Sequence, residues 1–104
     1  MDKAGDMALG MSVSSGAKDP SVWYTGRLAG DPLGKLEAPI VAAKGSAVET
    51  GDSQRWGDYS SMSIDPSDDC TFWYSQMYYN RKDGGKASGD WDTRIVAFKF
   101  DSCQ

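Results

Sequence analysis

The stretch Cys70-Thr-Phe-Trp-Tyr-Ser-Gln-Met-Tyr-Tyr79 decides the fold class of this chain. It is rich in aromatic residues and holds neither glycine nor proline, which is the composition of a β-strand. The turn-forming sequence Asp65-Pro-Ser-Asp-Asp69 precedes it, and a charged, glycine-bearing segment, Asn80–Asp90, follows it. We therefore expect a strand bounded by a tight turn on one side and a solvated loop on the other.

Working outward, the rest of the chain also predicts strands rather than helices. In Asp6–Ser14 large and small residues alternate, which is the period of a strand. Proline at position 39 confines its strand to a sheet edge, because proline cannot donate to a ladder. The five further strands are expected at Asp6–Ser14, Ser21–Leu28, Leu36–Ala43, Ser60–Ile64 and Thr93–Phe100. The expected fold class is all-β, with about six strands in antiparallel, propeller-blade-like sheets.

A weak internal repeat divides the single domain of 104 residues. Asp2–Ser12 aligns with Asp65–Ser75, each an aspartate turn followed by a strand. The division predicts two incomplete blades, 1–44 and 55–104, joined by a loop at 45–54. One blade lacks its first strand and the other its last, so each has an open edge. Either the chain is a fragment of a longer propeller, or it is a homo-oligomer in which copies complete each other's blades.

Composition excludes several classes of function. The net charge of -4 lacks the basic surface that nucleic-acid binding requires. The chain has no histidine, which excludes Ser-His or Cys-His catalysis and argues against a zinc site of ordinary ligands. No apolar run approaches the length of about 20 residues that spans a membrane. We expect no nucleic-acid partner and no membrane span.

The two cysteines, Cys70 and Cys103, bear on the compartment. One opens a predicted strand and the other follows the end of the next, so an antiparallel pair would place them side by side. A disulfide here favours an extracellular or periplasmic location. Two buried free thiols are the alternative.

The run from Arg55-Trp-Gly-Asp-Tyr59 to Cys70-Thr-Phe-Trp-Tyr74 resembles secreted bacterial sialidase-like (BNR-type) β-propeller proteins, most of unknown function. The resemblance covers most of the chain and implies about two blades. The Asp-box of that family is absent in proper form, since Trp91 follows Asp83-Gly-Gly85 several residues too late. The arginines of this chain cannot be assigned to the arginine triad of true sialidases.

Arg55, Trp56, Asp58 and Tyr59 form the candidate ligand-binding surface, because aromatic rings stack on sugars and carboxylates accept their hydroxyl protons. We expect an extracellular module that binds glycan or protein. The alternative is a small glycoside hydrolase in which Asp58 is catalytic and pairs with Glu49, Asp90 or Asp92, either within one chain or across an oligomer interface. A further reading is that Asp58 only caps a turn.

The aspartates of the 65–69 turn, Asp65, Asp68 and Asp69, are the candidate ligands for a metal ion. Carboxylates crowded in one tight loop suit Ca²⁺, although the spacing is not that of an EF-hand. The competing interpretation is an Asp-Pro turn with solvated carboxylates. Apart from this calcium candidate, the sequence predicts no cofactor.

Overall fold

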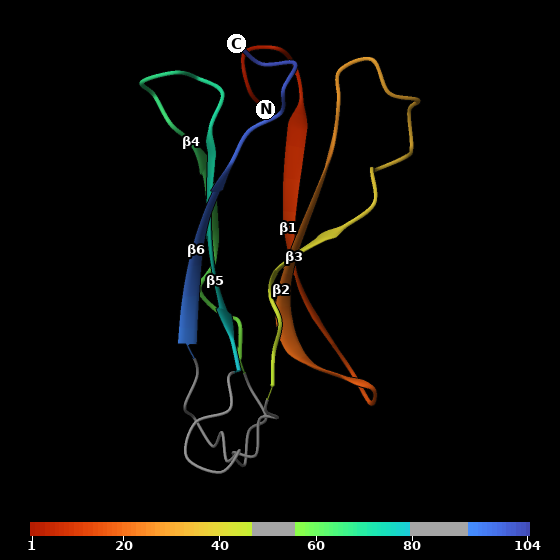
Figure 1. Ribbon diagram of the computed structural model, residues 1–104, viewed down its shortest axis with the longest axis vertical. Coiled ribbons are helices and arrows are strands. Elements are labelled where there is room, and N and C mark those ends of the chain that lie inside the picture. The colour runs from red at the N-terminus through yellow and green to blue at the C-terminus, as the bar shows by residue number, and fades with distance from the viewer. Residues whose placement is uncertain (47–55, 80–91) are drawn as a thin grey trace.

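The computed structural model describes residues 1–46, 56–79 and 92–104 as two three-stranded antiparallel sheets (Figure 1). The first sheet has the order β1-β2-β3 and the second the order β4-β5-β6. This confirms the expected all-β class with six strands. The strands are β1 (Met7–Ser15), β2 (Lys18–Arg27), β3 (Ile40–Ala43), β4 (Ser61–Ile64), β5 (Phe72–Tyr78) and β6 (Asp92–Phe98). Among the described residues there is no helix of the length and apolarity needed to cross a bilayer.

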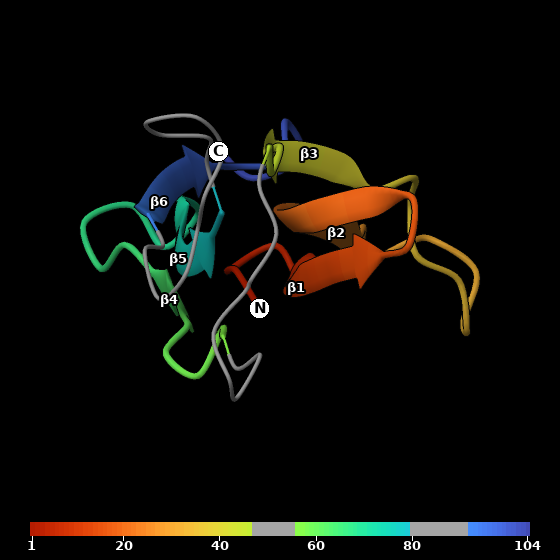
Figure 2. The same cartoon turned by 90° about the horizontal axis from the view of Figure 1, so that it is seen from below.

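The two sheets pack face to face, as the end-on view of Figure 2 shows. Val22 and Ala43 of the first sheet meet Tyr74 and Tyr78 of the second in the buried core. At the rim of this core the rings of Tyr24 and Phe98 stack with their centroids 4.2 Å apart. Apolar burial of this kind contributes most of the stability of a small domain.

Proline has the expected effect on β3. This strand lies at the edge of the first sheet, as Pro39 predicts. It begins only at Ile40, so the expected strand Leu36–Ala43 is shortened to the four residues after the proline. Glu37 still donates its backbone N–H to the carbonyl of Gly26 at 2.8 Å, which holds the preceding segment beside β2.

The internal repeat is visible in the turns that precede β1 and β5. Asp2 Oδ1 accepts a hydrogen bond from the backbone N–H of Ala4, and Asp65 Oδ1 accepts the equivalent bond from Ser67, each at 2.9 Å. β1 then pairs with β2 as β5 pairs with β6. In the described residues the first sheet has no strand beyond β1, and the second has none beyond β6.

The alternation of large and small residues along β1 has an unexpected orientation. Gly10 lies against the ring of Tyr74 so closely that a Cβ atom could not be accommodated there. The small residues of β1 therefore face the second sheet. Its large residues face outward, and Leu9 is 49% exposed.

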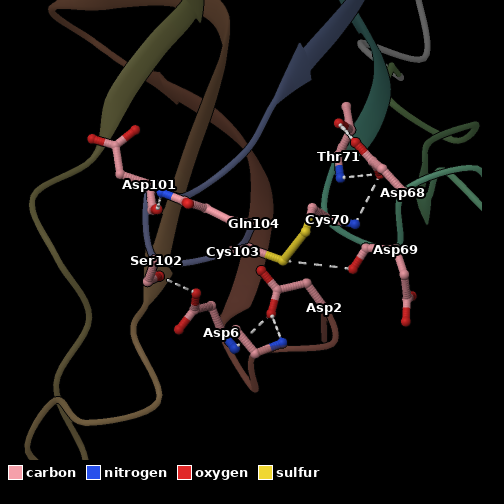
Figure 3. Close-up of a disulfide and its surroundings, with 11 residues drawn as sticks. Asp2, Asp6, Asp68, Asp69, Cys70, Thr71, Asp101, Ser102, Cys103 and Gln104 are labelled. Atoms are coloured by element: carbon pink, nitrogen blue, oxygen red, sulfur yellow. Dashed lines mark hydrogen bonds between the residues drawn. A yellow bond between two sulfur atoms is a disulfide. The ribbon is translucent and has the colours of Figure 1, made fainter.

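The predicted Cys70–Cys103 disulfide is present, with the Cα atoms 5.6 Å apart (Figure 3). Both cysteines are buried, and the alternative of two free thiols is excluded. The bond ties the turn before β5 to the segment after β6. Lys3 donates its backbone N–H to the carbonyl of Asp69 at 3.0 Å, so the N-terminal turn joins the same end of the molecule.

Candidate functional site

The residues predicted at 55–59 to form a binding surface do not all lie at the surface: Trp56 packs inward, whereas Asp58 and Tyr59 are exposed. Trp56 is half-buried, and its ring meets that of the fully buried Tyr79 edge-on, with centroids 6.2 Å apart. Gly57 has a φ of +79°, a conformation that residues with a side chain rarely adopt. Arg55 lies outside the described residues. Trp56 is therefore held by packing, and the exposed candidates are Asp58 and Tyr59.

Asp58 and Tyr59 border a hollow of about 500 Å³ on the outer face of the second sheet. Tyr59 is 83% exposed. The register of the sheet brings the other lining residues together from all three strands and the approach to β4. They are Ser60, Ser61, Ser75, Met77 and Thr93.

The lining of this hollow combines three kinds of chemistry. The carboxylate of Asp58 accepts hydrogen bonds, and the serine and threonine hydroxyls can both donate and accept them. The hydroxyls of Ser61 and Ser75 lie 3.1 Å apart, so they already form one hydrogen bond across the strands. The phenol of Tyr59 adds an apolar ring with a polar tip. Such a set suits recognition of a molecule rich in hydroxyl or amide groups.

The pairing of carboxylates that a glycoside hydrolase needs is not assembled among the described residues. Asp58 is the one carboxylate among the described residues that line the hollow. Asp92 pairs with Tyr78, whose side chain faces the core, while the neighbouring Thr93 faces the hollow. Because side chains alternate along a strand, Asp92 belongs to the opposite face. Glu49 and Asp90 lie outside the described residues.

Two large apolar side chains extend the surface beyond the hollow. Trp73 and Ile95 are exposed and lie on the same outer face, since Ile95 pairs with the hollow residue Ser75. Trp73 donates from its indole nitrogen to Asp65 Oδ2 at 3.2 Å. Sequence reasoning did not select Ile95 or Ser75. The cross-strand register that joins them is the signal that would have found them, and it requires the pairing to be known.

The aspartates proposed as calcium ligands instead build the turn before β5. Asp68 accepts hydrogen bonds from the backbone N–H groups of Cys70 and Thr71 at 2.9 Å, and from the Thr71 hydroxyl at 2.6 Å. These bonds, chiefly those from Thr71, lower the pKa of Asp68 to about 2. Bonds from Ser67 and Trp73 lower the pKa of Asp65.

Asp69 contributes to that turn with its backbone, which has a φ of +55°. The described residues contain no group of three or more acidic, cysteine or histidine side chains that could hold a metal ion. The turn interpretation therefore accounts for the three aspartates, and the structure does not support the calcium candidate.

Sequence reasoning missed two buried carboxylates, Asp2 and Asp6, of which Asp6 joins the two ends of the chain (Figure 3). Asp6 is 1% exposed and accepts hydrogen bonds from the backbone N–H of Ala29, at 2.8 Å, and from the hydroxyl of Ser102. Asp2 Oδ1 accepts the backbone N–H groups of Ala4 and Asp6. Donors satisfy both oxygens of Asp6, as burial of a carboxylate requires, whereas Asp2 Oδ2 is buried with no hydrogen-bond partner among the described residues. The hydrogen bonds of both aspartates are structural, because they hold the N-terminal turn in place.

A second hollow, of about 540 Å³, lies on the outer face of the first sheet near the β1–β2 hairpin. Lys18 places its ammonium group 5.2 Å from the centre of the Trp23 ring, a cation–π contact. Lys44 and Asp19 also line this hollow. It presents an apolar floor with a positively charged rim.

Comparison of the chain with protein-family models, with curated proteins and with solved structures gave no significant match. The chemistry of the two outer surfaces is therefore what bears on the function of this chain.

Proposed function

We propose that this chain is an extracellular, propeller-blade-like binding module that recognises glycan or protein through the surface around Asp58 and Tyr59. The observation that carries the proposal is the position of Tyr59, 83% exposed, beside a carboxylate and a row of hydroxyl side chains. Large exposed side chains gathered on one face are typical of binding surfaces.

Both ligand classes find support in this surface. The hydroxyl-rich lining with one aromatic ring suits a sugar, whose hydroxyl groups it can match while the ring stacks on its apolar face. The neighbouring Trp73 and Ile95 widen the surface into an apolar area that suits a protein. The hydrolase alternative requires a second carboxylate, and no described residue supplies one at the hollow.

The extracellular location is supported by the Cys70–Cys103 disulfide, since disulfides persist in oxidising compartments. It is also in keeping with the resemblance to secreted propeller proteins. Neither observation depends on the identity of the ligand.

A glycan panel screened with the purified, oxidised protein tests the proposal. We expect binding to one class of glycan, with a loss of about tenfold or more in Tyr59→Ala and in Asp58→Asn. Leu33→Ala and Asp101→Asn are matched controls, because both residues are exposed and lie outside the hollow. The same samples are analysed for product by mass spectrometry, and product that disappears in Asp58→Asn would favour the hydrolase.

A protein ligand is tested by the self-association experiment described below. If the chain binds no glycan and does not associate with protein, the proposed function is wrong.

A further inference from the structure

The outer face of the first sheet carries the large side chains that a folded domain normally buries. Leu9 is 49% exposed and Val41 is 50% exposed. The strand register places these residues on one face. We call this the apolar face after its apolar members, Met7, Leu9, Met11, Val13, Trp23 and Val41; Ser21, Thr25 and Arg27 lie on the same face.

The internal repeat shows what kind of surface such a face packs against. In the repeat, Leu9 and Met11 correspond to Phe72 and Tyr74, and Gly10 corresponds to Trp73. Phe72 and Tyr74 point inward onto the first sheet, where Tyr74 meets Gly10. The internal interface thus joins the Phe72–Tyr74 side of one repeat to the Gly10 side of the other.

The outer faces of the two sheets are the two sides of the repeat that do not take part in the internal interface. The apolar face is the repeat equivalent of the Phe72–Tyr74 side, and the outer face of the second sheet is the equivalent of the Gly10 side. We call the latter the serine face. It consists of small residues around three large ones: Ser61, Ser63, Ser75, Thr93, Ala97, Trp73, Met77 and Ile95. Small residues facing large ones allow two layers to interdigitate.

The charges on the two faces are complementary when they are stacked in the orientation of the internal interface. Tyr79 donates its backbone N–H to the carbonyl of Pro20 at 3.3 Å, so the hairpin end of the first sheet lies beside the Asp58 end of the second. In a stack, Lys18 and Lys44 of the apolar face would meet Asp58 of the serine face. Asp19 reduces the positive charge at that end.

At the other end of the stack, Arg27 lies on the apolar face, since it pairs with Met7. Asp65 lies beside the serine face, where it accepts the indole N–H of Trp73. Opposite charges would therefore meet at both ends of the stack. Complementary charges of this kind fix the orientation of two partners and raise their rate of association.

We propose that the protein partner of this module is a second copy of the chain, whose apolar face packs on the serine face and repeats the internal packing of the two sheets. This inference rests on the proposed function, because the serine face includes the Asp58–Tyr59 hollow. The contact joins two different faces, so each added copy leaves one face of each kind open. Head-to-tail contacts of this type close into rings or continue as filaments.

The experiment uses light scattering after size exclusion, and sedimentation velocity, on the oxidised chain over a range of concentrations. Wild type is expected to increase in mass with concentration. Leu9→Lys on the apolar face and Ile95→Lys on the serine face are each expected to remain monomeric. Both positions are largely exposed, so these variants should keep the wild-type circular dichroism spectrum. Leu33→Lys is the control, since Leu33 is 89% exposed and lies in the β2–β3 connection.

Mixing the two variants gives the decisive result. Leu9→Lys retains an intact serine face and Ile95→Lys an intact apolar face, so the mixture should form dimers with one copy of each and nothing larger. If Ile95→Lys alone still dimerises, the apolar face pairs with itself and the inference is wrong. A monomeric wild type also overturns it. A monomer that binds glycan through Tyr59 would leave the proposed function standing, whereas a monomer that binds nothing would remove both.

Discussion

The two sheets of this molecule begin with the same repeated motif and yet bury opposite sides of it. In β5 the large residues Phe72 and Tyr74 face the other sheet. In β1 the small residue Gly10 faces it, and Leu9 faces outward. Alternation determines which residues share a face, but the neighbouring layer determines which face is buried. The two sheets therefore meet through unlike sides of the repeat: the Gly10 side of the first sheet contacts the Phe72–Tyr74 side of the second.

The start of each repeat is attached to the rest of the molecule in a different way, which we call its closure. Cys70 and its disulfide stand where the first repeat has Met7. The first repeat is closed by Asp6, whose hydrogen bonds reach Ala29 and Ser102. A covalent closure and a closure by hydrogen bonds can be compared in the same molecule.

Removing the covalent closure should have the largest effect on stability. The disulfide spans a sequence separation of 33, for which loop-closure entropy predicts a loss of about 4 kcal/mol in the Cys70→Ser, Cys103→Ser variant. Urea unfolding of this variant measures the loss, and wild type in a reducing agent should show a similar one. Equal midpoints for variant and wild type would mean that the hydrogen bonds alone hold this end.

Adding a side chain at the Gly10–Tyr74 contact between the two sheets should have the next largest effect on stability. Gly10→Ala would place a methyl group inside the Tyr74 ring, and we expect a loss of about 1–3 kcal/mol in the free energy of unfolding. Gly16→Ala is the matched control, because a Cβ there meets no atom within 4 Å. If both variants unfold at the same urea concentration, the sheets are not packed as closely as described.

Weakening the hydrogen-bonded closure should have a smaller effect. Asp6→Asn keeps one acceptor oxygen but replaces the other with a donor that cannot accept the hydroxyl proton of Ser102. We expect a loss of about 1–2 kcal/mol, in the lower part of the range for a buried polar group that loses its hydrogen-bond partner. Asp101→Asn, at an exposed position, is the control. Thermal melts of the two variants decide the point, and a loss in Asp101→Asn as large as in Asp6→Asn would contradict it.

The smallest effect is expected in the pH dependence of the turn before β5. The folded-state pKa of Asp68, about 2, is lower than its usual value. The group therefore stabilises the fold above the unfolded-state pKa of about 4, and this contribution is lost as the pH falls toward 2. Asp68→Asn should lower the melting temperature by a few degrees at pH 7, and the gap to wild type should narrow between pH 4 and pH 2. A gap that stays constant with pH would exclude the carboxylate as its cause.

Much of the fold could be predicted from the sequence. The dense aromatic stretch at 70–79, the alternation in β1 and the effect of Pro39 are local signals, and each strand they predict is present. The disulfide followed from the expected order of two antiparallel strands. The inward orientation of Gly10 could not be predicted, because it depends on which face of β1 the second sheet covers.

The candidate site was predicted less completely, for physical reasons that differ by residue. Asp58 and Tyr59 do lie together at a hollow, but Trp56 packs against Tyr79, a residue 23 positions away that the local sequence could not indicate. Ser75, Thr93 and Ile95 reach the surface through strand register. The three turn aspartates show the opposite difficulty. Their crowding in the sequence suggested a metal site, but Asp65 and Asp68 accept backbone N–H groups and Asp69 contributes its backbone conformation to the turn.

The disulfide also determines how the molecule would respond to a mechanical load. A pull on the two ends reaches Cys103 and passes directly to Cys70, so β5 and β6 bear no tension while the bond is intact. An extended chain spans about 3.3–3.6 Å per residue, and the bond therefore conceals roughly 110 Å of contour length. Under tension the first sheet and β4 would unravel, because both precede Cys70, whereas β5 and β6 would stay within the closed loop until reduction of the bond released the remaining length.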